Sequence, residues 1–598
     1  MRRWLFLLSL PSAIMAAALA AAQVVPVRAA LPASPEAASL LGSYLAGRVA
    51  RAQNDTRAAA AFYRQALAQD PGNNLLIEQA FLMETSEGEW SRAEALARDL
   101  VASQPNHRTA HALLGLADFK AQRYATADEH FKAVSGNPIG ELTSAMARAW
   151  VAEAQGKTTE ALALLDAPKL PDWAQFYLRY HRALISDVGG RRAEARAAYE
   201  RIPANDQRTL RITLAYARHA ANAGDGKLAQ RILKAHFDKA KADGHPEAKA
   251  LQDQIDAGAQ LSLLVSTPTE GLAEAFYGLG EALTGEGGVS VGAVYLQFSL
   301  FLRPDFPFAL ATLANAYETT KRYQAAIDAY DRIPNDTALQ VSIEIRKALN
   351  LNQLERVEEA KDLLEGTAQR NPTDVRPLDA LGGIMRGHKR YAEAVEYYSR
   401  AIALIDKPEQ KHWSFFYSRG TCYERIKKWA QAEADLQRSL QLSPEQPLAL
   451  NYLGYSWIDQ GKNLKQGMAL IEKAVRQKRD DGYIVDSLGW AHYRLGNFKE
   501  AVKHLERAVE LRPEDPVLND HLGDAFWRVG REREARFQWE QALTLKPEPE
   551  DAEKIKRKLQ RGLPSPQQAR PVKRTKEVVK KEHLKKSSET TFSLPLFK

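Results

Sequence analysis

A 34-residue repeat near the C-terminal end constrains this chain more than any other feature. Each copy contains a Leu-Gly pair, a further Gly, two Ala and one Pro. This pattern predicts two amphipathic helices joined at the second Gly, with small residues where the helix axes approach closely and Pro ending the second helix. One such hairpin cannot bury its apolar face alone, so copies must stack into a solenoid. The two copies, within 482–548, carry Leu488-Gly489, Gly496, Ala501, Ala508 and Pro513, then Leu522-Gly523, Gly530, Ala535, Ala542 and Pro547.

The period and the residue set resemble the tetratricopeptide repeat, TPR. The resemblance implies an all-α fold, a TPR-type helical-hairpin solenoid. Counting units by their small residues gives about fourteen helix pairs in two arrays.

The first array is predicted at 40–237, where an alanine recurs every 34 residues at the position expected early in each second helix. Most other repeat residues are missing from its later units, so these divergent repeats are assigned by spacing. The recurring residues are Ala59, Ala93, Ala127, Ala161, Ala195 and Ala229.

Residues 238–270 interrupt this spacing and are predicted to be a joint between two arrays. The second array is predicted at 271–547, with two short insertions expected to lengthen loops. Several glycines between 278 and 288 could suggest a phosphate loop, but no strand pattern precedes them, so a helix-pair turn is the better interpretation. The small positions of the second array are Gly292, Ala326, Ala360, Ala394, Ala432, Gly467, Ala501 and Ala535.

The first 29 residues are predicted to be a signal peptide, with Arg2 and Arg3 before an apolar run and Val27-Arg28-Ala29 as a cleavage site. We therefore expect a periplasmic or envelope-associated protein. The alternative is an uncleaved N-terminal membrane anchor, because the apolar run approaches the length of a membrane span. No Cys lies near the cleavage region, so we do not expect a lipid-anchored N-terminus.

The C-terminal end is predicted to contain a capping helix at 548–563 and a basic, disordered tail at 564–598. The tail holds nine Lys or Arg against three Glu, a net charge of +6 out of +8 for the chain. Such a segment could bind an anionic surface, and the alternative is a solubilising tail without a partner. Nucleic acid is not an expected partner, because the signal peptide directs the protein out of the cytoplasm.

The sequence offers no recognisable catalytic, metal or cofactor site. Its thirteen His show no metal-ligand spacing, no nucleophile elbow is present, and a single cysteine, Cys422, precludes an intramolecular disulfide. His521, between Asp520 and Asp524, is more typical of a packed histidine because it adjoins the Leu522-Gly523 packing pair. We therefore predict a protein that is not an enzyme.

A partner-binding groove is predicted along the first helices of the last three units. If the Leu-Gly pair holds positions 7 and 8 of a unit, then positions 2, 5, 9, 12 and 13 form one stripe on the first helix. We call it the first-helix stripe. Its aromatic and Arg residues are typical of interfaces, and the alternative is that both Trp pack between helices while the charges face water. The predicted groove comprises Asn451, Tyr455, Tyr483, Asp486, Trp490, Tyr493, Arg494, Asp520, Asp524, Trp527 and Arg528.

Three segments carry a narrower resemblance: 451–457, 481–490 and 519–530, followed by Phe537-Gln538-Trp539. They are similar to proteobacterial envelope TPR proteins, one branch of which comprises outer-membrane lipoproteins that bind a carboxy-terminal processing protease. The resemblance implies an adaptor that activates a periplasmic protease and delivers cell-wall hydrolases to it. This chain lacks the lipidated cysteine of that branch and has the basic tail in addition.

These observations predict a non-enzymatic scaffold or adaptor in the bacterial cell envelope, with protein partners that include a carboxy-terminal processing protease. One alternative is a scaffold for outer-membrane, pilus or polysaccharide assembly or export. The other, from a different class, is a repeat-containing transferase or hydrolase.

Overall fold

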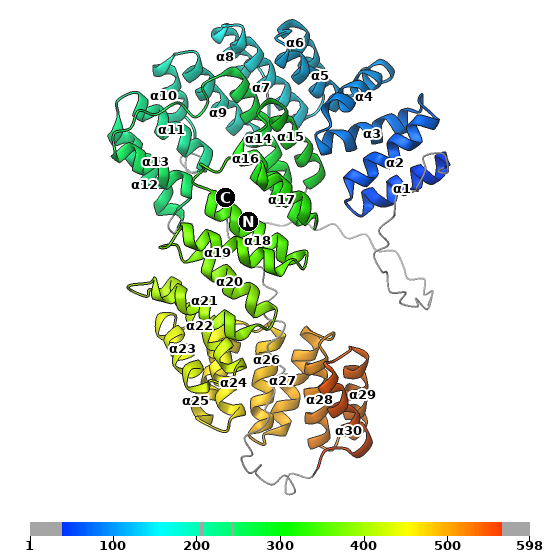
Figure 1. The fold of residues 1–598 in the computed structure, drawn as a ribbon, viewed down its shortest axis with the longest axis vertical. Coiled ribbons are helices and arrows are strands. Elements are labelled where there is room, and N and C mark those ends of the chain that lie inside the picture. Colours follow the sequence, from blue (N-terminus) through cyan, green and yellow to red (C-terminus); the bar gives the residue numbers. More distant parts are fainter. Residues whose placement is uncertain (1–38, 204–208, 241–243, 286–287, 565–598) are drawn as a thin grey trace, which may run out of the picture. The chain divides into compact units, whose positions relative to one another are not determined.

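The computed structural model describes residues 39–203, 209–240, 244–285 and 288–564. Within these residues the chain forms α-helices and one short 3₁₀ helix, with no β-strand, which confirms the predicted all-α solenoid (Figure 1). The predicted signal peptide and almost all of the predicted basic tail lie outside the described residues. The chain divides into two compact units, Met1–Pro105 and Asn106–Lys598, which we describe separately.

The first unit consists of two helix pairs around an apolar core that includes Phe62, Tyr63 and Leu76. Gly47 is required in this core, because a Cβ atom there would lie 2.9 Å from the ring of Tyr63. The helices are α1 (Leu40–Ala52), α2 (Thr56–Gln69), α3 (Asn74–Glu87) and α4 (Trp90–Ser103).

The second unit continues the succession of antiparallel helix pairs. Each odd-numbered helix from α5 to α11 is the first helix of a pair, and α13 packs against α11 and α12. The helices are α5 (Arg108–Lys120), α6 (Tyr124–Ala133), α7 (Pro138–Ala154), α8 (Thr158–Asp166), α9 (Asp172–Val188), α10 (Arg192–Glu200), α11 (Leu210–Asn222), α12 (Gly226–Ala240) and α13 (Pro246–Asp256).

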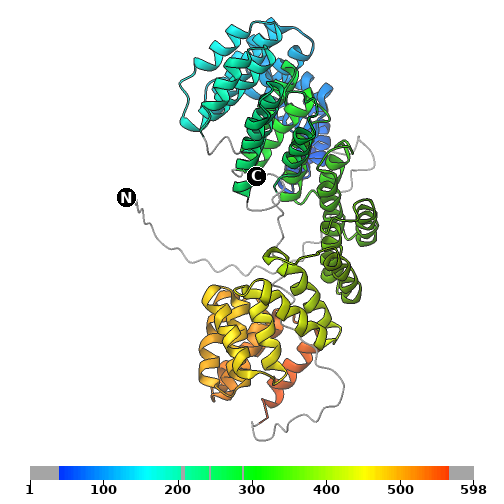
Figure 2. The same ribbon diagram turned by 90° about the vertical axis from the view of Figure 1, so that its left-hand side faces the viewer.

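From α14 onward the even-numbered helices are the first helices, and the pairs stack side by side, as the yellow to orange helices show in Figure 2. The pairs are α14 (Pro268–Gly285) with α15 (Val289–Leu302), α16 (Pro307–Thr319) with α17 (Tyr323–Asp331), α18 (Gln340–Gln353) with α19 (Val357–Arg370), α20 (Arg376–Gly387) with α21 (Tyr391–Ala403), α22 (Trp413–Arg425) with α23 (Trp429–Leu442), α24 (Pro447–Asp459) with α25 (Leu464–Gln477), α26 (Gly482–Arg494) with α27 (Phe498–Leu511), and α28 (Pro516–Arg528) with α29 (Glu532–Thr544). A short 3₁₀ helix, η2 (Gln410–His412), precedes α22, and α30 (Pro549–Arg561) follows α29.

The recurring alanines hold the helix pairs together as the spacing predicted. All six alanines of the first array, and all six of the second, are fully buried. Their small side chains let the two axes of each pair approach closely. The turn glycines are also confirmed, since Gly496 and Gly530 both have a φ of 82°. Other units place Lys321, Lys389 or Lys427 in the same left-handed conformation, which explains why turn glycines cannot be followed through the whole chain.

Helices α14 and α15 fold back onto the first helices of the preceding pairs. α14 packs against α7 and α9, and α15 against α5. A Cβ atom at Gly271 of α14 would lie 2.2 Å from the indole of Trp150, so only glycine fits there. The Lys120 ammonium donates a hydrogen bond to the carbonyl of Phe301, at 3.0 Å. The division into two arrays with a joint at 238–270 stays a prediction, but these contacts join the two segments into one packed body.

A buried ion pair fastens α14 to this surface. The Arg211 guanidinium donates to the Glu274 carboxylate, with 2.8 Å between Nε and Oε1, and the Tyr180 hydroxyl donates to the same carboxylate at 3.1 Å. Desolvation lowers the pKa of Arg211, but the Glu274 charge outweighs it and raises that pKa. Arg211 also lies over the ring of Phe308, at 4.6 Å from its centroid.

Replacing Glu274 by Gln should destabilise the second unit strongly, because it leaves the Arg211 charge buried without its counter-ion. We expect a loss of about 3 kcal/mol in the free energy of unfolding, measured by urea denaturation. Glu359→Gln removes an exposed partner of Arg356 and should leave the unfolding midpoint unchanged. Equal midpoints for wild type and Glu274→Gln would contradict this role of the ion pair.

A second prediction concerns pH and His181, a fully buried residue of α9. The indole N–H of Trp150 donates to His181 Nδ1 at 3.0 Å, so this nitrogen must stay unprotonated, and desolvation lowers the pKa of His181 to about 4. A pKa below that of the unfolded chain, about 6.5, gives stability that is present above about pH 6.5 and is lost as the pH falls toward 4. We expect a loss of about 2 kcal/mol between about pH 7 and pH 5.

The measurement is urea denaturation at each pH, with His181→Gln as the control. The amide oxygen of Gln can still accept from Trp150 but does not titrate in this range. The variant should therefore lose less stability on acidification than the wild type. An identical pH dependence in both proteins would show that His181 is not responsible.

Candidate functional site

The predicted groove lies on consecutive first helices, α24, α26 and α28, which are held close to their second helices by glycine. A Cβ atom at Gly489 would lie 2.6 Å from Leu505, and one at Gly523 would lie 2.5 Å from Trp539. These contacts turn the Leu-Gly face of each first helix toward its second helix. The stripe residues consequently lie on the remaining sides of the first helices.

On α24 the two predicted residues are mostly enclosed by protein. Asn451 and Tyr455 are both 6% exposed. The Asn451 side-chain oxygen is buried and has no hydrogen-bond partner among the described residues. From the next first helix, Arg494 reaches back to α24, where it donates to the Asp459 carboxylate at 2.6 Å and to the Asp459 carbonyl at 2.9 Å. Arg494 remains exposed, so it is the most accessible of the predicted groove residues in this region.

An aromatic stack joins α26 to α28. The half-buried Trp490 lies parallel to Tyr493, at 4.7 Å between ring centroids, and to His521, at 3.8 Å. His521 is buried and its Nδ1 lies 2.9 Å from the carboxylate of Asp486, which is itself 2% exposed. Desolvation lowers the pKa of His521 to about 3. His521 is thus a packed residue, as its position beside the Leu-Gly pair predicted.

Tyr483 lies apart from this stack, at the start of α26. Its hydroxyl donates to the Asp515 carboxylate at 3.2 Å, and the Arg512 guanidinium lies 5.6 Å from the centroid of its ring. Its contacts are with the loop between α27 and α28, so it supports the junction of two units.

Helix α30 covers the stripe of the last unit. The Lys558 ammonium donates to the carboxylates of Asp520, at 2.8 Å, and Asp524, at 2.9 Å. Burial and the neighbouring Asp524 raise the pKa of Asp520 to about 7, while Lys558 opposes this shift. Arg528 donates to the carbonyl of Pro564 at 2.6 Å.

The segment after α30 encloses Trp527. A Cβ atom at Gly562 would lie 2.0 Å from the Trp527 indole, and Trp527 also lies 5.4 Å from Trp539 between ring centroids. The packing alternative raised for the two tryptophans therefore describes Trp527. Asp520, Asp524, Trp527 and Arg528 all contact the chain's own C-terminal segment, and the role of the whole set as a partner-binding groove stays a prediction.

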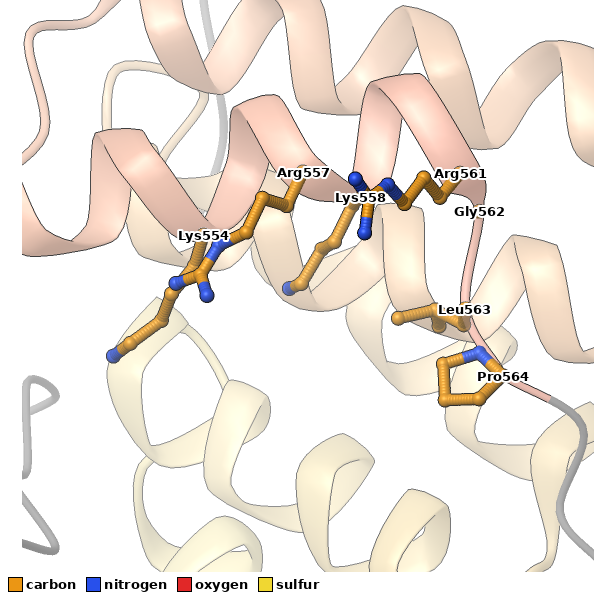
Figure 3. A pocket seen from close by; sticks show the side chains of 7 residues that line it. All are labelled: Lys554, Arg557, Lys558, Arg561, Gly562, Leu563 and Pro564. Atoms are coloured by element: carbon orange, nitrogen blue, oxygen red, sulfur yellow. The ribbon is translucent and has the colours of Figure 1, made fainter. Parts of the chain in front are cut away.

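One side of α30 is basic. Four cationic side chains extend from one side of the helix and, with Gly562, Leu563 and Pro564, line a pocket of about 420 Å³ (Figure 3). Lys558 and Lys554 pair with aspartates, at 2.8 Å and 3.0 Å. Arg561 makes no ion pair with a described residue. The cations that line the pocket are Lys554, Arg557, Lys558 and Arg561.

The stripe of the first helices α5 to α11 was not read from the sequence, although the same spacing identifies it. Stripe positions in these helices make the contacts with α14 and α15 described above. Thr143, at position 2 of its unit, lies 3.4 Å from the hydroxyl of Tyr295. The stripe residues that touch α14 or α15 are Lys120, Thr143, Trp150, Tyr177, Tyr180 and Arg211.

The remaining features concern the single cysteine, possible metal ligands and possible membrane spans. Cys422 is buried, and desolvation raises the pKa of its thiol to about 11, so it is protonated near neutral pH. In the part of the chain that the structure describes, no group of three or more His, Cys, Asp or Glu side chains is arranged to hold a metal ion. None of the described helices combines the length and apolar character needed to cross a membrane.

Sequence models of the tetratricopeptide repeat match residues 44–75, 86–138, 417–482 and 485–515. The chain therefore contains tetratricopeptide repeats, and its fold is the helical-hairpin solenoid that such repeats build. Tetratricopeptide repeats indicate a scaffold for protein–protein interaction, which is typically non-catalytic.

Two curated proteins share part of this sequence. A TPR repeat-containing protein of Pseudomonas aeruginosa is 29% identical over 198 residues, which cover 32% of this chain and 31% of that protein. Human tetratricopeptide repeat protein 13 is 34% identical over 103 residues, covering 17% of this chain and 11% of that protein. The chain thus spans less than a third of the length of either relative.

Solved structures with similar helical arrangements include the Cut9–Hcn1 hetero-tetramer of the APC/C and yeast Tom70. The first is 15% identical, with 89% of this chain and 98% of that chain covered and a TM-score of 0.37. The second is 12% identical, with 87% and 95% covered and a TM-score of 0.34.

Replacing Lys558 by Ala should destabilise the C-terminal end of the solenoid, since Asp520 and Asp524 would lose their shared cation. We expect a loss of about 2–3 kcal/mol, measured by urea denaturation and by faster amide exchange in α28 to α30. Lys556→Ala, which removes an exposed partner of Glu553, is the matched control and should change neither observable. Equal exchange rates in both variants would contradict a capping role for Lys558.

Proposed function

We propose that this protein is a non-enzymatic adaptor of the cell envelope that holds a protein partner on the first-helix stripe of α18 to α26. One observation carries the proposal: the stripe already binds helices of the same chain in two places. On α5 to α11 it binds α14 and α15, and on α28 it binds α30. A surface that binds helices within its own chain has the chemistry to bind a helix or peptide of another protein.

The stripe between these two places is free of such an internal occupant. Among the described residues, the main contacts of α18, α20, α22, α24 and α26 are with helices of their own and neighbouring units and with the short η2 helix. In this region the stripe contains the exposed Arg494 and the half-buried Trp490 and Tyr493. Aromatic and Arg side chains that are already held in place by neighbours lose little conformational freedom on binding.

The envelope location rests on the N-terminal segment, whose Arg pair, apolar run and small-residue site are typical of a signal peptide. The nature of the partner rests on the resemblance of 451–457, 481–490 and 519–530 to the envelope adaptors of processing proteases. The adaptor would hold a protease and a cell-wall hydrolase on one chain and so raise their effective concentration.

The test is crosslinking in envelope fractions of cells that produce the tagged full chain, followed by identification of the proteins that co-purify. Arg494→Ala should reduce recovery of the partner about tenfold, because this change leaves the Trp490 stack intact but removes an accessible hydrogen-bond donor. Arg507→Ala, on the second helix α27 and also exposed to water, is the control. The double variant Trp490→Ala, Arg494→Ala should lose the partner entirely.

Recovery of a processing protease or wall hydrolase that falls in the Arg494 variant supports the adaptor proposal. Recovery of outer-membrane assembly or export components would replace the proposed partner, and recovery unaffected by both variants would exclude this stripe. For the location, alkaline phosphatase fused after residue 40 should be active in cells. An inactive fusion would overturn the envelope assignment.

A further inference from the structure

One face of α20 carries a pair of opposite charges separated by bare backbone. Asp379, Gly383, Arg386 and Gly387 occupy stripe positions 5, 9, 12 and 13 of their unit, and we call them the α20 face. Asp379 and Gly387 are exposed, whereas Gly383 and Arg386 are half-buried. Seven residues separate the two charged positions, so their Cα atoms lie about 10 Å apart along the helix.

Neither of the two charged side chains forms a hydrogen bond or an ion pair with a described residue. The arginines on either side of the α20 face are paired. Arg376 donates to the Asp374 carboxylate at 2.9–3.0 Å through its main-chain and side-chain nitrogens, and Arg390 donates to Glu393 at 2.6 Å. A half-buried guanidinium without a counter-ion has lost hydration that a bound carboxylate could replace.

The surroundings keep Arg386 charged. Desolvation lowers its pKa, but Tyr398, Tyr417, Cys422 and Asp379 outweigh it and raise that pKa. Desolvation raises the pKa of Asp379 to about 6, although the side chain is exposed to solvent.

The two glycines of the α20 face have no packing role. A Cβ atom at Gly383 would come no closer than 4.0 Å to any neighbour, and one at Gly387 would have none within 4 Å. Gly382, in contrast, is packed against Tyr398, where a Cβ atom would lie at 2.7 Å. Gly383 lies inside α20, where glycine costs about 1 kcal/mol relative to alanine, whereas Gly387 is the last residue of the helix. At positions 9 and 13 the last three units carry Tyr455, Trp490, Asp524, Asp459, Arg494 and Arg528.

We propose that the α20 face binds a zwitterionic peptide segment of the partner, with a carboxylate on Arg386 and a cationic side chain on Asp379. Gly383 and Gly387 let the backbone of that segment approach α20 closely. A separation of about 10 Å corresponds to three residues of extended chain or seven residues of helix. The carboxylate is supplied by an acidic side chain or by the C-terminus of the partner. This inference rests on the proposed function and specifies the chemistry of its site.

The experiment measures fluorescence anisotropy of defined labelled peptides on the purified chain from residue 30 to 598. Three peptide pools are used: extended peptides with Lys three residues before Glu and blocked ends, helical peptides with the two seven residues apart, and extended peptides with Lys three residues before a free C-terminus. A fourth pool, with Gln in place of Glu and blocked ends, lacks the carboxylate. At least one of the first three pools should bind the wild type more tightly than the fourth.

Arg386→Gln should weaken binding of the best-bound carboxylate-containing pool about tenfold and leave the affinity of the fourth pool unchanged. Asp379→Asn should weaken the same pool. Arg356→Gln, which removes one positive charge just before α19 as Arg386→Gln does on α20, should leave the affinity unchanged. Gly383→Leu is expected to fold, since a Cβ atom at this position would meet no neighbour closer than 4.0 Å. It should retain or increase the melting temperature but abolish binding by filling the α20 face.

Equal affinity of every pool for wild type and Arg386→Gln would overturn the inference, as would an equal loss for pools with and without the carboxylate. Loss only in the Arg494 and Trp490 variants would also overturn it, but would keep the proposed groove. Peptide binding that depends on Arg386 together with an inactive phosphatase fusion would keep the α20 face and reject the envelope adaptor.

Discussion

The buried pair of Arg211 and Glu274 is the interaction on which the arrangement of the second unit depends. A solenoid is held together by contacts between neighbouring units, so its stability is local. The pair adds a contact between α11 and α14, 63 residues apart, and Tyr180 of α9 joins it. Because both charges are buried, each is tolerated only while the other is present. The fold-back of α14 is therefore tied to the register of α9 and α11.

The fold-back of α14 buries the first-helix stripe of α7 and α9. The residues of α7, α9 and α11 that meet α14 occupy the positions that would face a partner in an open array. Trp150, which closes on Gly271, is fully buried as a result. The same principle acts at the C-terminal end, where Lys558 neutralises Asp520 and Asp524. Among the described residues, two segments of the chain thus bind the stripe, one at each side of the first helices α18 to α26 in the sequence.

Repeat spacing predicts the helix pairs well because it reflects a local requirement. Ala501 and Ala535 lie where the two helices of one hairpin meet, so only a small side chain fits there, and both are fully buried. The turn glycines could also be predicted, because the turn between the two helices of a hairpin is a local requirement as well. The fading of these glycines in other units also has a local cause, since Lys389 and Lys427 adopt the same positive φ at a modest cost in strain.

Repeat spacing alone could not reveal which stripe residues contact other segments of the same chain, because those contacts depend on packing between segments distant in the sequence. Asp520 and Asp524 are predicted to bind a partner, and α30 places the Lys558 ammonium within hydrogen-bond distance of both carboxylates. Tyr483 has the right position on its helix, yet its hydroxyl bonds to Asp515 of the following loop. Asp379 and Arg386 went unnoticed because the stripe was read only in the last three units. Extending the same positions one unit at a time would have found them.

The α20 face shows why a departure from local rules is informative. Gly383 weakens the interior of a helix without easing any contact, and Arg386 is partly desolvated without a counter-ion. The adjacent Gly382, in contrast, is explained by the ring of Tyr398, and the flanking Arg390 is paired with the carboxylate of Glu393. Sequences are consistent with their fold except where function imposes another demand. Two such departures on one face of one helix, in the part of the stripe that no other described segment of the chain occupies, favour a surface shaped by a ligand.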